Sequence, residues 1–257
     1  MPFLKEPEYT HGKTGKTAIL LINLGTPDAP ERGAVKRYLK QFLWDQRVVE
    51  IPRPVWWLIL NGIILPFRSG QSAKKYATIW TKDGSPLKIH TEKQAMLLKG
   101  YLGERGHDVH VSWAMRYGSP SIPSALQKLK QEGYDRILIL PAYPQYSATT
   151  TASNMDAVFS HYQQVRNVPE LRFVRNYHDH PAYIEALRQS VLKHWQQNGR
   201  PEKLVMSFHG LPKAFLLRGD PYHCECYKTA RLLAEKLGLT KDQYLVTFQS
   251  RLGKEEW

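Results

Sequence analysis

The sequence predicts an α/β fold of two Rossmann-like units, each a parallel sheet flanked by helices, and three observations favour it. Short apolar runs rich in β-branched residues alternate along the 257-residue chain with helix-like periods of about 10 to 15 residues. The apolar runs are nearly continuous, which is typical of strands that are covered on both faces. A plan of strand, glycine-containing turn and helix occurs in both halves of the chain, which indicates two units.

The individual elements follow from these patterns in chain order. Apolar runs of strand length predict strands over 17–24, 109–114, 136–140, 171–177, 204–208 and 244–248. Helical periodicity predicts helices over 31–43, 92–102, 121–132, 152–165, 181–197 and 224–237. Gly133 and Gly238 lie just past two of these helices, where glycine ends a helix by adopting the left-handed conformation without strain.

The order of the elements predicts the domain organisation. Residues 1–15 are polar and predict a flexible N-terminal arm. We expect a first unit over 16–165, with an apolar lip, and a second unit over 166–257. No crossover helix follows the strand at 244–248, so we expect the second unit to be truncated at its C-terminal end.

The charge balance limits the choice of partners. The net charge of +13 fits nucleic acid, an anionic membrane surface or an acidic small molecule. The basic residues are scattered and form no nucleic-acid motif, so we expect no nucleic-acid partner. Cys224 and Cys226 are too close in sequence to pair readily, and no disulfide framework is possible. These features predict a protein of a reducing compartment, the cytoplasm.

The longest apolar stretch, at 54–67, has two interpretations. It is shorter than the roughly 20 residues that span a bilayer, and Asn61 and Gly62 interrupt it. One interpretation is a buried helix or loop. The other is a lip that touches a membrane interface or an apolar ligand, because Trp56 and Trp57 begin the stretch and Arg68 follows it. Sequence patterns leave both open.

Chemistry-bearing residues follow the predicted strands, where ligands bind in open α/β sheets. His209 comes directly after an apolar strand, Gly210 leaves room beside it, and Pro212 stiffens the turn. An imidazole there can accept a proton or bind a metal such as Fe²⁺, or it can be a structural residue. No dinucleotide fingerprint, Walker motif, nucleophile elbow or H-E-x-x-H motif is present. The run "HCEC" at 223–226 lacks the four ligands of a tetrahedral metal site.

Six motifs in order resemble those of bacterial ferrochelatases, and the resemblance as a whole covers about residues 17–253. They are "LLINLGTPDAP", "KDGSPLKIHTEKQA", "AMRYGSPS", "LPAYPQYSATTTAS", "MSFHGLP" and "RGDPYHCECYKTA". The resemblance implies two Rossmann-like units that face each other across a cleft. It implies a lyase that inserts Fe²⁺ into protoporphyrin IX to give protohaem, the last step of haem biosynthesis.

The resemblance also implies site residues. His209 matches the histidine that faces the porphyrin nitrogens, as proton acceptor, iron ligand or both in turn. Six further positions match residues that contact the porphyrin: Arg68, Tyr76, Ser85, Arg116, Tyr117 and Tyr146. An arginine holds a propionate bidentately, and hydroxyl groups complete the hydrogen bonds. The match at Ser85 depends on a segment, 77–84, that is longer than in some family members.

The family's site also uses a glutamate in a C-terminal part that has no match here. We therefore expect a longer protein to be active and this chain alone to be inactive. Zinc insertion by this chain at the full rate would contradict that expectation. Fe²⁺ is expected as substrate, and two cysteines cannot hold a four-thiolate iron–sulfur cluster. We expect a cytoplasmic monomer, peripheral at the inner membrane face through 54–67. The alternatives are a coproporphyrin or sirohaem-type chelatase, and a non-catalytic porphyrin-binding protein.

Overall fold

The computed structural model describes residues 3–251 and 256–257, and the chain divides into two compact units. The first unit comprises Met1–Ala142 and Ala148–Val174, and the second comprises Tyr143–Ser147 and Arg175–Trp257. The boundary between the two units lies further along the chain than the predicted 165/166, because the strand at Glu170–Phe173 pairs into the sheet of the first unit.

The sheet of the first unit has four parallel strands in the order β2-β1-β3-β4. The strands are β1 (Lys16–Gly25), β2 (His110–Tyr117), β3 (Tyr134–Pro141) and β4 (Glu170–Phe173). Four predicted strands are thus confirmed, although β4 ends before the predicted 177. Because all four run in one direction, their carboxyl ends meet at one edge, where the predicted site residues Arg116 and Tyr117 lie.

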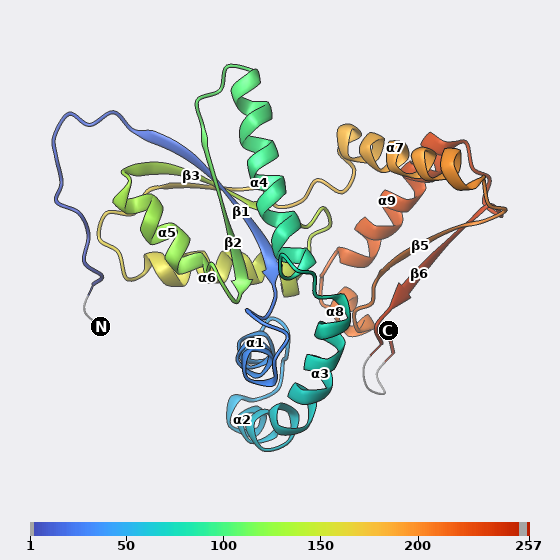
Figure 1. The fold of residues 1–257 in the computed structure, drawn as a ribbon, viewed down its shortest axis with the longest axis horizontal. Helices are drawn as coiled ribbons and strands as arrows, with labels where there is room; N and C mark the ends of the chain where they lie inside the picture. The colour runs from blue at the N-terminus through green and yellow to red at the C-terminus, as the bar shows by residue number, and fades with distance from the viewer. Residues whose placement is uncertain (1–2, 252–255) are drawn as a thin grey trace. The chain divides into compact units, whose positions relative to one another are not determined.

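Helices cover both faces of this sheet, as the continuous apolar strands predicted (Figure 1). Leu20 and Ile22 of β1 pack on the face covered by α5 (Ile122–Gln131) and α6 (Ser153–Tyr162). Leu21, between them in sequence, points to the other face. There it packs against α4 (Pro86–Glu104). The period of two along a strand therefore divides β1 between two hydrophobic cores.

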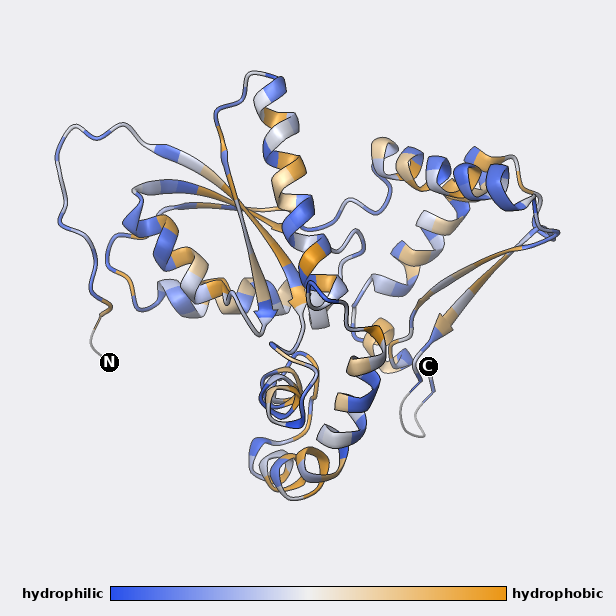
Figure 2. Cartoon of the chain, in the orientation of Figure 1, coloured by the Kyte–Doolittle hydropathy of each residue, from blue (hydrophilic) through white to orange (hydrophobic). Residues whose placement is uncertain are grey.

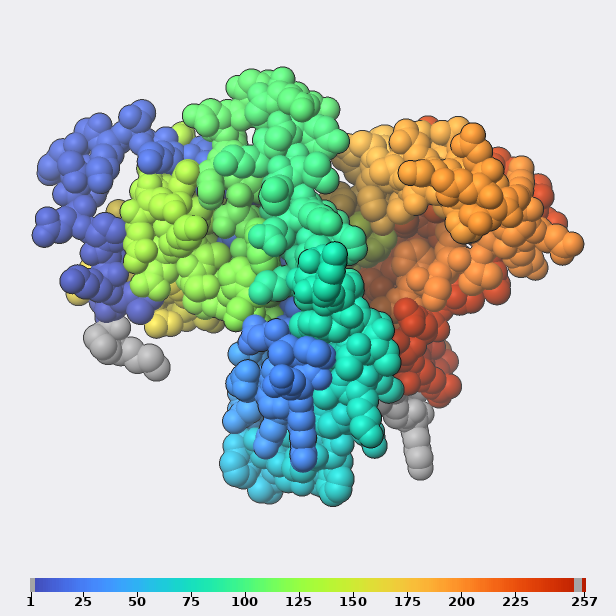
Figure 3. Space-filling view, viewed as in Figure 1, coloured from blue at the N-terminus to red at the C-terminus, as the bar shows by residue number. Residues whose placement is uncertain are grey.

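The apolar stretch at 54–67 forms part of a helical projection that stands out from the sheet of the first unit (Figure 3). The projection comprises α1 (Arg32–Trp44), α2 (Arg53–Ile59), the π-helix η1 (Leu60–Ile64) and α3 (Leu65–Ile79). Trp56, Leu60 and Leu65 are buried together in its core. Large apolar side chains on its outer surface are exposed: Val55, Trp57, Leu58, Ile63 and Phe67. In Figure 2, the helix α2 carries orange, hydrophobic residues beside white and blue ones. The stretch therefore has both a packed face and an exposed apolar face.

The second unit is built around two parallel strands, β5 (Leu204–His209) and β6 (Tyr244–Gln249). Its helices are α7 (Pro181–Asn198), α8 (Lys213–Leu217) and α9 (Tyr222–Leu237). Met206 and Phe208 of β5 face a core that includes residues of both α7 and α9. Val205, on the opposite face of β5, is 56% exposed. One face of this small sheet is thus packed and the other is open.

The predicted flexible arm makes defined contacts with the first unit. The backbone N–H of Leu4 donates to the carbonyl of Gln164 at 2.8 Å. The Glu6 carboxylate accepts hydrogen bonds from the backbone of Arg166 (2.7 Å) and of Asn167 (3.2 Å). The first residues of the arm are therefore held against the loop between α6 and β4. None of the helices in the described residues is long and apolar enough to cross a membrane.

Candidate active site

The carboxyl ends of β1 and β2 lie very close together in the first unit. Gly25 ends β1 opposite Tyr117 of β2 and has a φ of +114°. A Cβ atom on Gly25 would lie 1.7 Å from the carbonyl oxygen of Tyr117. Only glycine fits this close approach, because any other side chain would clash with the neighbouring strand and would be strained at that φ. The approach brings residue 117 against the turn that follows β1.

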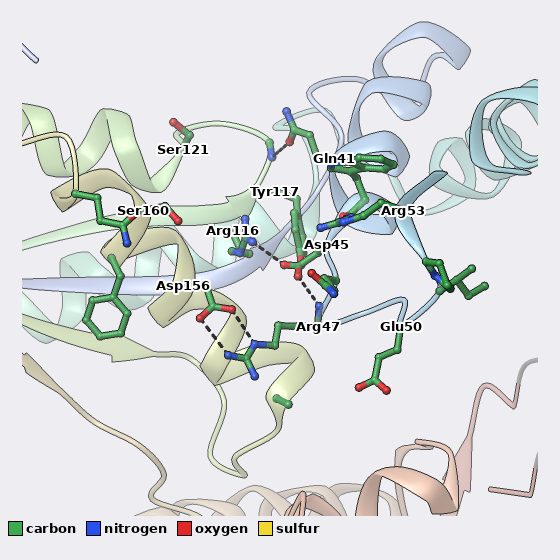
Figure 4. Close-up of a pocket in the computed structure, with 18 residues that line it drawn as sticks. Gln41, Asp45, Arg47, Glu50, Arg53, Arg116, Tyr117, Ser121, Asp156 and Ser160 are labelled. Carbon is green, nitrogen blue, oxygen red and sulfur yellow. Dashed lines mark hydrogen bonds and ion pairs between the residues drawn. The ribbon is translucent and has the colours of Figure 1, made fainter. Parts of the chain in front are cut away.

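A buried carboxylate organises this strand end. Oδ2 of Asp45 accepts hydrogen bonds from Arg116 (2.6 Å), from the hydroxyl of Tyr117 (2.8 Å) and from Ser153 (2.5 Å). Arg116 also donates through Nε to Oγ of Ser153 at 2.7 Å. The network joins the loop after α1, the end of β2 and the start of α6. Figure 4 shows Asp45, Arg116 and Tyr117 together. The network therefore links the base of the helical projection to the sheet.

The network shifts the pKa values of its members. Burial by itself raises the pKa of Asp45, but the hydrogen bonds from Ser153, Tyr117 and the Arg47 backbone and the charge of Arg116 outweigh it, so the pKa lies below its usual value. Burial raises the pKa of Tyr117 far above its usual value. At neutral pH the site thus contains an ionised carboxylate bonded to a neutral phenol and a guanidinium.

A cavity of about 1290 Å³ lies beside this network, wholly within the first unit (Figure 4). Its walls include both sides of an ion pair between Arg47 and Asp156, whose closest atoms are 2.7 Å apart. The guanidinium of Arg53 lies 4.5 Å from the ring centroid of Trp44 on another wall. The cavity is thus lined by both arginines and carboxylates, so its lining does not carry the positive charge alone that an anion-binding site would need.

Three predicted porphyrin contacts lie on or next to the helical projection. Arg68 is exposed on α3, and Tyr76 is half-buried further along the same helix. The ring of Tyr76 meets that of Tyr38 edge-on at 6.1 Å, and burial raises the pKa of Tyr76. Ser85 is buried at the N-cap of α4, where its side chain makes no capping hydrogen bond. The hydroxyl of Ser85 is thus not used by its own helix.

His209 ends β5 on the open face of the second unit's sheet. The alternation along β5 places it on the same side as Val205, and it is exposed. Its Nδ1 lies 2.8 Å from the carbonyl oxygen of Gly210, and Nε2 is the nitrogen left for chemistry. The predicted strand-end position of His209 is therefore confirmed.

Gly210 has a different role from the predicted one. Its N–H donates to the carbonyl of Gln249 at 2.7 Å and continues the pairing of β5 with β6. A Cβ atom on Gly210 would lie 2.9 Å from that carbonyl and 3.0 Å from the ring of Trp257. The glycine thus accommodates the neighbouring strand and an indole ring. The room that we predicted beside His209 is occupied by the protein itself.

Tyr146 lies in the segment of the second unit that precedes η2 (Ala148–Ala152). The guanidinium of Arg175 lies 4.3 Å from its ring centroid. Its backbone N–H donates to Glu225 at 2.7 Å. Glu225 belongs to the "HCEC" run. Cys226 in that run is buried, Cys224 is exposed, and both thiols are free.

Comparison with known proteins agrees with the motif order. The family model described as Ferrochelatase matches residues 16–257. This chain belongs to the ferrochelatase family. Ferrochelatases of Janthinobacterium sp. (strain Marseille) and Herminiimonas arsenicoxydans are each 70% identical over 257 residues, which are the whole of this chain and 70% of each relative. The ferrochelatase of Polaromonas sp. is 64% identical over 261 residues, and the match covers the whole chain and 71% of that relative.

The structure of this ferrochelatase-family chain brings some of the predicted residues together. Arg116 and Tyr117 share one network in the first unit, whereas Tyr146 and His209 belong to the second unit. Sequence reasoning missed Asp45, Ser153 and Glu225. Ser153 ends the motif "LPAYPQYSATTTAS", and no sequence signal distinguishes it from the other hydroxyl residues there. Glu225 lies between two cysteines, which favour a metal interpretation of that run.

In the described part of the chain, no three His, Cys, Asp or Glu side chains are grouped so that they could hold a metal ion.

Proposed function

We propose that this chain binds protoporphyrin IX and inserts Fe²⁺ to give protohaem, with the release of two protons. The match of the ferrochelatase family model over residues 16–257 carries this proposal. The exposed histidine at a strand end supports it, because porphyrin metallation needs a group that accepts a proton at neutral pH. No observation on the described residues favours the coproporphyrin, sirohaem-type or non-catalytic alternatives.

His209 is the proposed proton acceptor. Because Nδ1 lies against the Gly210 carbonyl, a neutral imidazole with its proton on Nδ1 presents a free lone pair on Nε2. That lone pair takes a pyrrole proton or coordinates incoming Fe²⁺, and the same atom cannot do both at once. The exposure of His209 lets the proton pass on to water.

The proposed porphyrin contacts divide into free and committed groups. Arg68 is an exposed guanidinium and suits a propionate, and Ser85 offers a hydroxyl. Tyr146 is a committed group, because the guanidinium of Arg175 lies 4.3 Å from its ring centroid. Arg116 and Tyr117 are committed to Asp45, so we assign them to shaping the cavity wall rather than to gripping the propionates.

Replacing Arg68 with alanine is expected to weaken protoporphyrin IX binding roughly tenfold, because one charge-assisted hydrogen bond to a carboxylate is lost. Fluorescence titration measures the affinity. Lys75→Ala, an exposed basic residue of the same helix, is the matched control and should change the affinity little. Equal affinities of the variant and the unaltered chain would contradict the assignment, and so would an equal loss with the dimethyl ester, which lacks free carboxylates.

We also propose that the outer surface of the helical projection contacts a membrane interface, which makes the chain a peripheral protein at the cytoplasmic face. Trp57 is 54% exposed and Phe67 is 71% exposed on that surface. Arg68, Lys74 and Lys75 follow on α3, and basic residues beside an apolar surface favour anionic lipid.

Replacing Trp57 and Phe67 together with glutamine is expected to lower partitioning to phosphatidylglycerol vesicles at least about tenfold, since each buried aromatic ring contributes about 1.5–3 kcal/mol. Vesicle co-sedimentation measures this partitioning. Leu217→Gln is the matched control, because Leu217 is 76% exposed on α8, outside the projection. If the double variant of Trp57 and Phe67 partitions to vesicles as strongly as the unaltered chain, the projection is not the membrane contact.

A further inference from the structure

We propose that residues 220–226, at the start of α9, form a brace that positions Tyr146, with Glu225 as its principal positioning residue. This inference rests on the proposed function, which places Tyr146 beside the porphyrin. It assigns a role to the "RGDPYHCEC" motif, whose metal interpretation the structure does not support. All of its contacts lie within the second unit.

The Glu225 carboxylate accepts hydrogen bonds from two segments of the chain. It is only 7% exposed, so its carboxylate needs partners inside the protein. Oε2 accepts the backbone N–H of Tyr146 at 2.7 Å and lies 3.3 Å from Nδ1 of His178. Oε1 accepts Nδ2 of Asn176 at 2.7 Å and lies 3.6 Å from Arg175. The carboxylate thus ties the segment after β3 to the segment after β4.

Arg175 extends this hold from the backbone of Tyr146 to its ring. The guanidinium lies 4.3 Å from the ring centroid while it faces the Glu225 carboxylate at 3.6 Å. Stacking of a guanidinium on an aromatic face restricts the ring's orientation. Glu225 therefore fixes Tyr146 twice, directly at its N–H and indirectly through the cation on its ring.

The residues just before α9 hold the neighbour of Tyr146 as well. Asp220 is 9% exposed and accepts a hydrogen bond from the hydroxyl of Ser147 at 3.0 Å. Its other oxygen accepts the backbone N–H of Tyr222 at 3.0 Å. Asp220 thus ties the Tyr146 segment to the first turn of α9.

The brace explains how irregular segments hold a precise geometry. Residues 143–147 and 175–178 belong to no strand or helix, so a sheet does not fix their backbones. Functional side chains on such loops need supporting hydrogen bonds, because a misplacement of 1 Å costs about 10²-fold in rate. The two buried carboxylates, Glu225 in the first turn of α9 and Asp220 just before this helix, provide that support.

The test follows the ring of Tyr146 directly, by ¹⁹F NMR of the chain labelled with 3-fluorotyrosine. Tyr146→Phe assigns the resonance. Glu225→Ala is expected to shift and broaden it and to weaken protoporphyrin IX binding about tenfold. Glu225→Gln keeps an acceptor for the Tyr146 N–H and is expected to have smaller effects on both. Glu185→Ala, an exposed carboxylate of α7, is the matched control and should change neither.

Arg175→Ala provides a second test of the brace if Glu225→Ala does not fold. The Arg175 side chain is 56% exposed, so its removal leaves the core intact, and we expect it alone to shift the Tyr146 resonance. An unchanged Tyr146 resonance in Arg175→Ala and in folded Glu225→Ala would overturn the brace. A shifted resonance with unchanged porphyrin affinity would support the brace and contradict the proposed place of Tyr146 in porphyrin binding.

Discussion

Replacing His209 with alanine is expected to lower the rate of metal insertion into protoporphyrin IX by about 10²–10⁴-fold, the usual contribution of a positioned acid–base group. The Nε2 atom is exposed at the strand end, and alanine removes the proton acceptor without opening a cavity in a core. Porphyrin affinity should stay within about threefold, because the contacts that bind the macrocycle are on other residues. Zinc insertion with protein in excess over porphyrin resolves slow rates.

Two controls make this prediction specific. His194→Ala removes an exposed histidine of α7 in the same unit and should leave the rate unchanged. Free imidazole should restore part of the rate to His209→Ala, since it replaces the missing base. A variant that retains most of the unaltered rate would show that His209 is a structural residue.

Replacing Asp45 with alanine is expected to destabilise the first unit by about 3–5 kcal/mol, because it leaves a partly buried arginine without its counter-charge. The side chain of Asp45 is 7% exposed and that of Arg116 is 21% exposed, so water replaces the lost partner poorly. The buried hydroxyl of Tyr117 loses an acceptor as well. Urea unfolding followed by tryptophan fluorescence measures the change in free energy of unfolding.

The pH dependence of the free energy of unfolding distinguishes the effect of the Asp45 charge from the effect of its side-chain shape. Its pKa is lower in the folded chain than in the unfolded chain, so its ionisation stabilises the fold above about pH 4. That stabilisation is lost as the pH falls through the folded-state pKa. Asp45→Asn should therefore lower stability at pH 7 and flatten its dependence on pH below 5.

Asp156→Asn is the matched control for this substitution. Asp156 pairs with Arg47, but both side chains are 45% exposed. An exposed pair contributes at most about 1 kcal/mol, so its loss should have little effect. Equal destabilisation by Asp45→Asn and Asp156→Asn would contradict the central place of Asp45 in the network.

The sequence predicted the regular elements well where burial determined them. Residues 17–24 and 136–140 are mostly apolar because helices cover both faces of the first sheet, and this pattern is visible without a structure. Helix α4 begins at Pro86, before the predicted 92, because proline is favourable at the first position of a helix. Local composition could not assign 170–173 to the first sheet, since pairing with β3 is a long-range choice.

The candidate site was predictable in position but not in its bonding. The strand-end rule located His209 and Arg116 without any contact information. It could not reveal that Arg116 is bonded to Asp45, because the two are distant in the sequence and meet only when α1 packs beside β2. Gly210 was misinterpreted for the same reason, since the atoms that require a glycine belong to Gln249 and Trp257.

The most direct test of the central claim is the conversion of protoporphyrin IX by the unaltered chain. Absorbance spectroscopy follows free-base porphyrin and its zinc complex together, with the same mixture lacking protein as the reference. Because the family model matches residues 16–257, we predict, against the expectation of an inactive chain, that the chain binds the porphyrin and that the zinc complex forms faster than in buffer. His209→Ala should remove this acceleration. Tight porphyrin binding with zinc insertion no faster than in buffer would contradict the account and favour a non-catalytic porphyrin-binding protein.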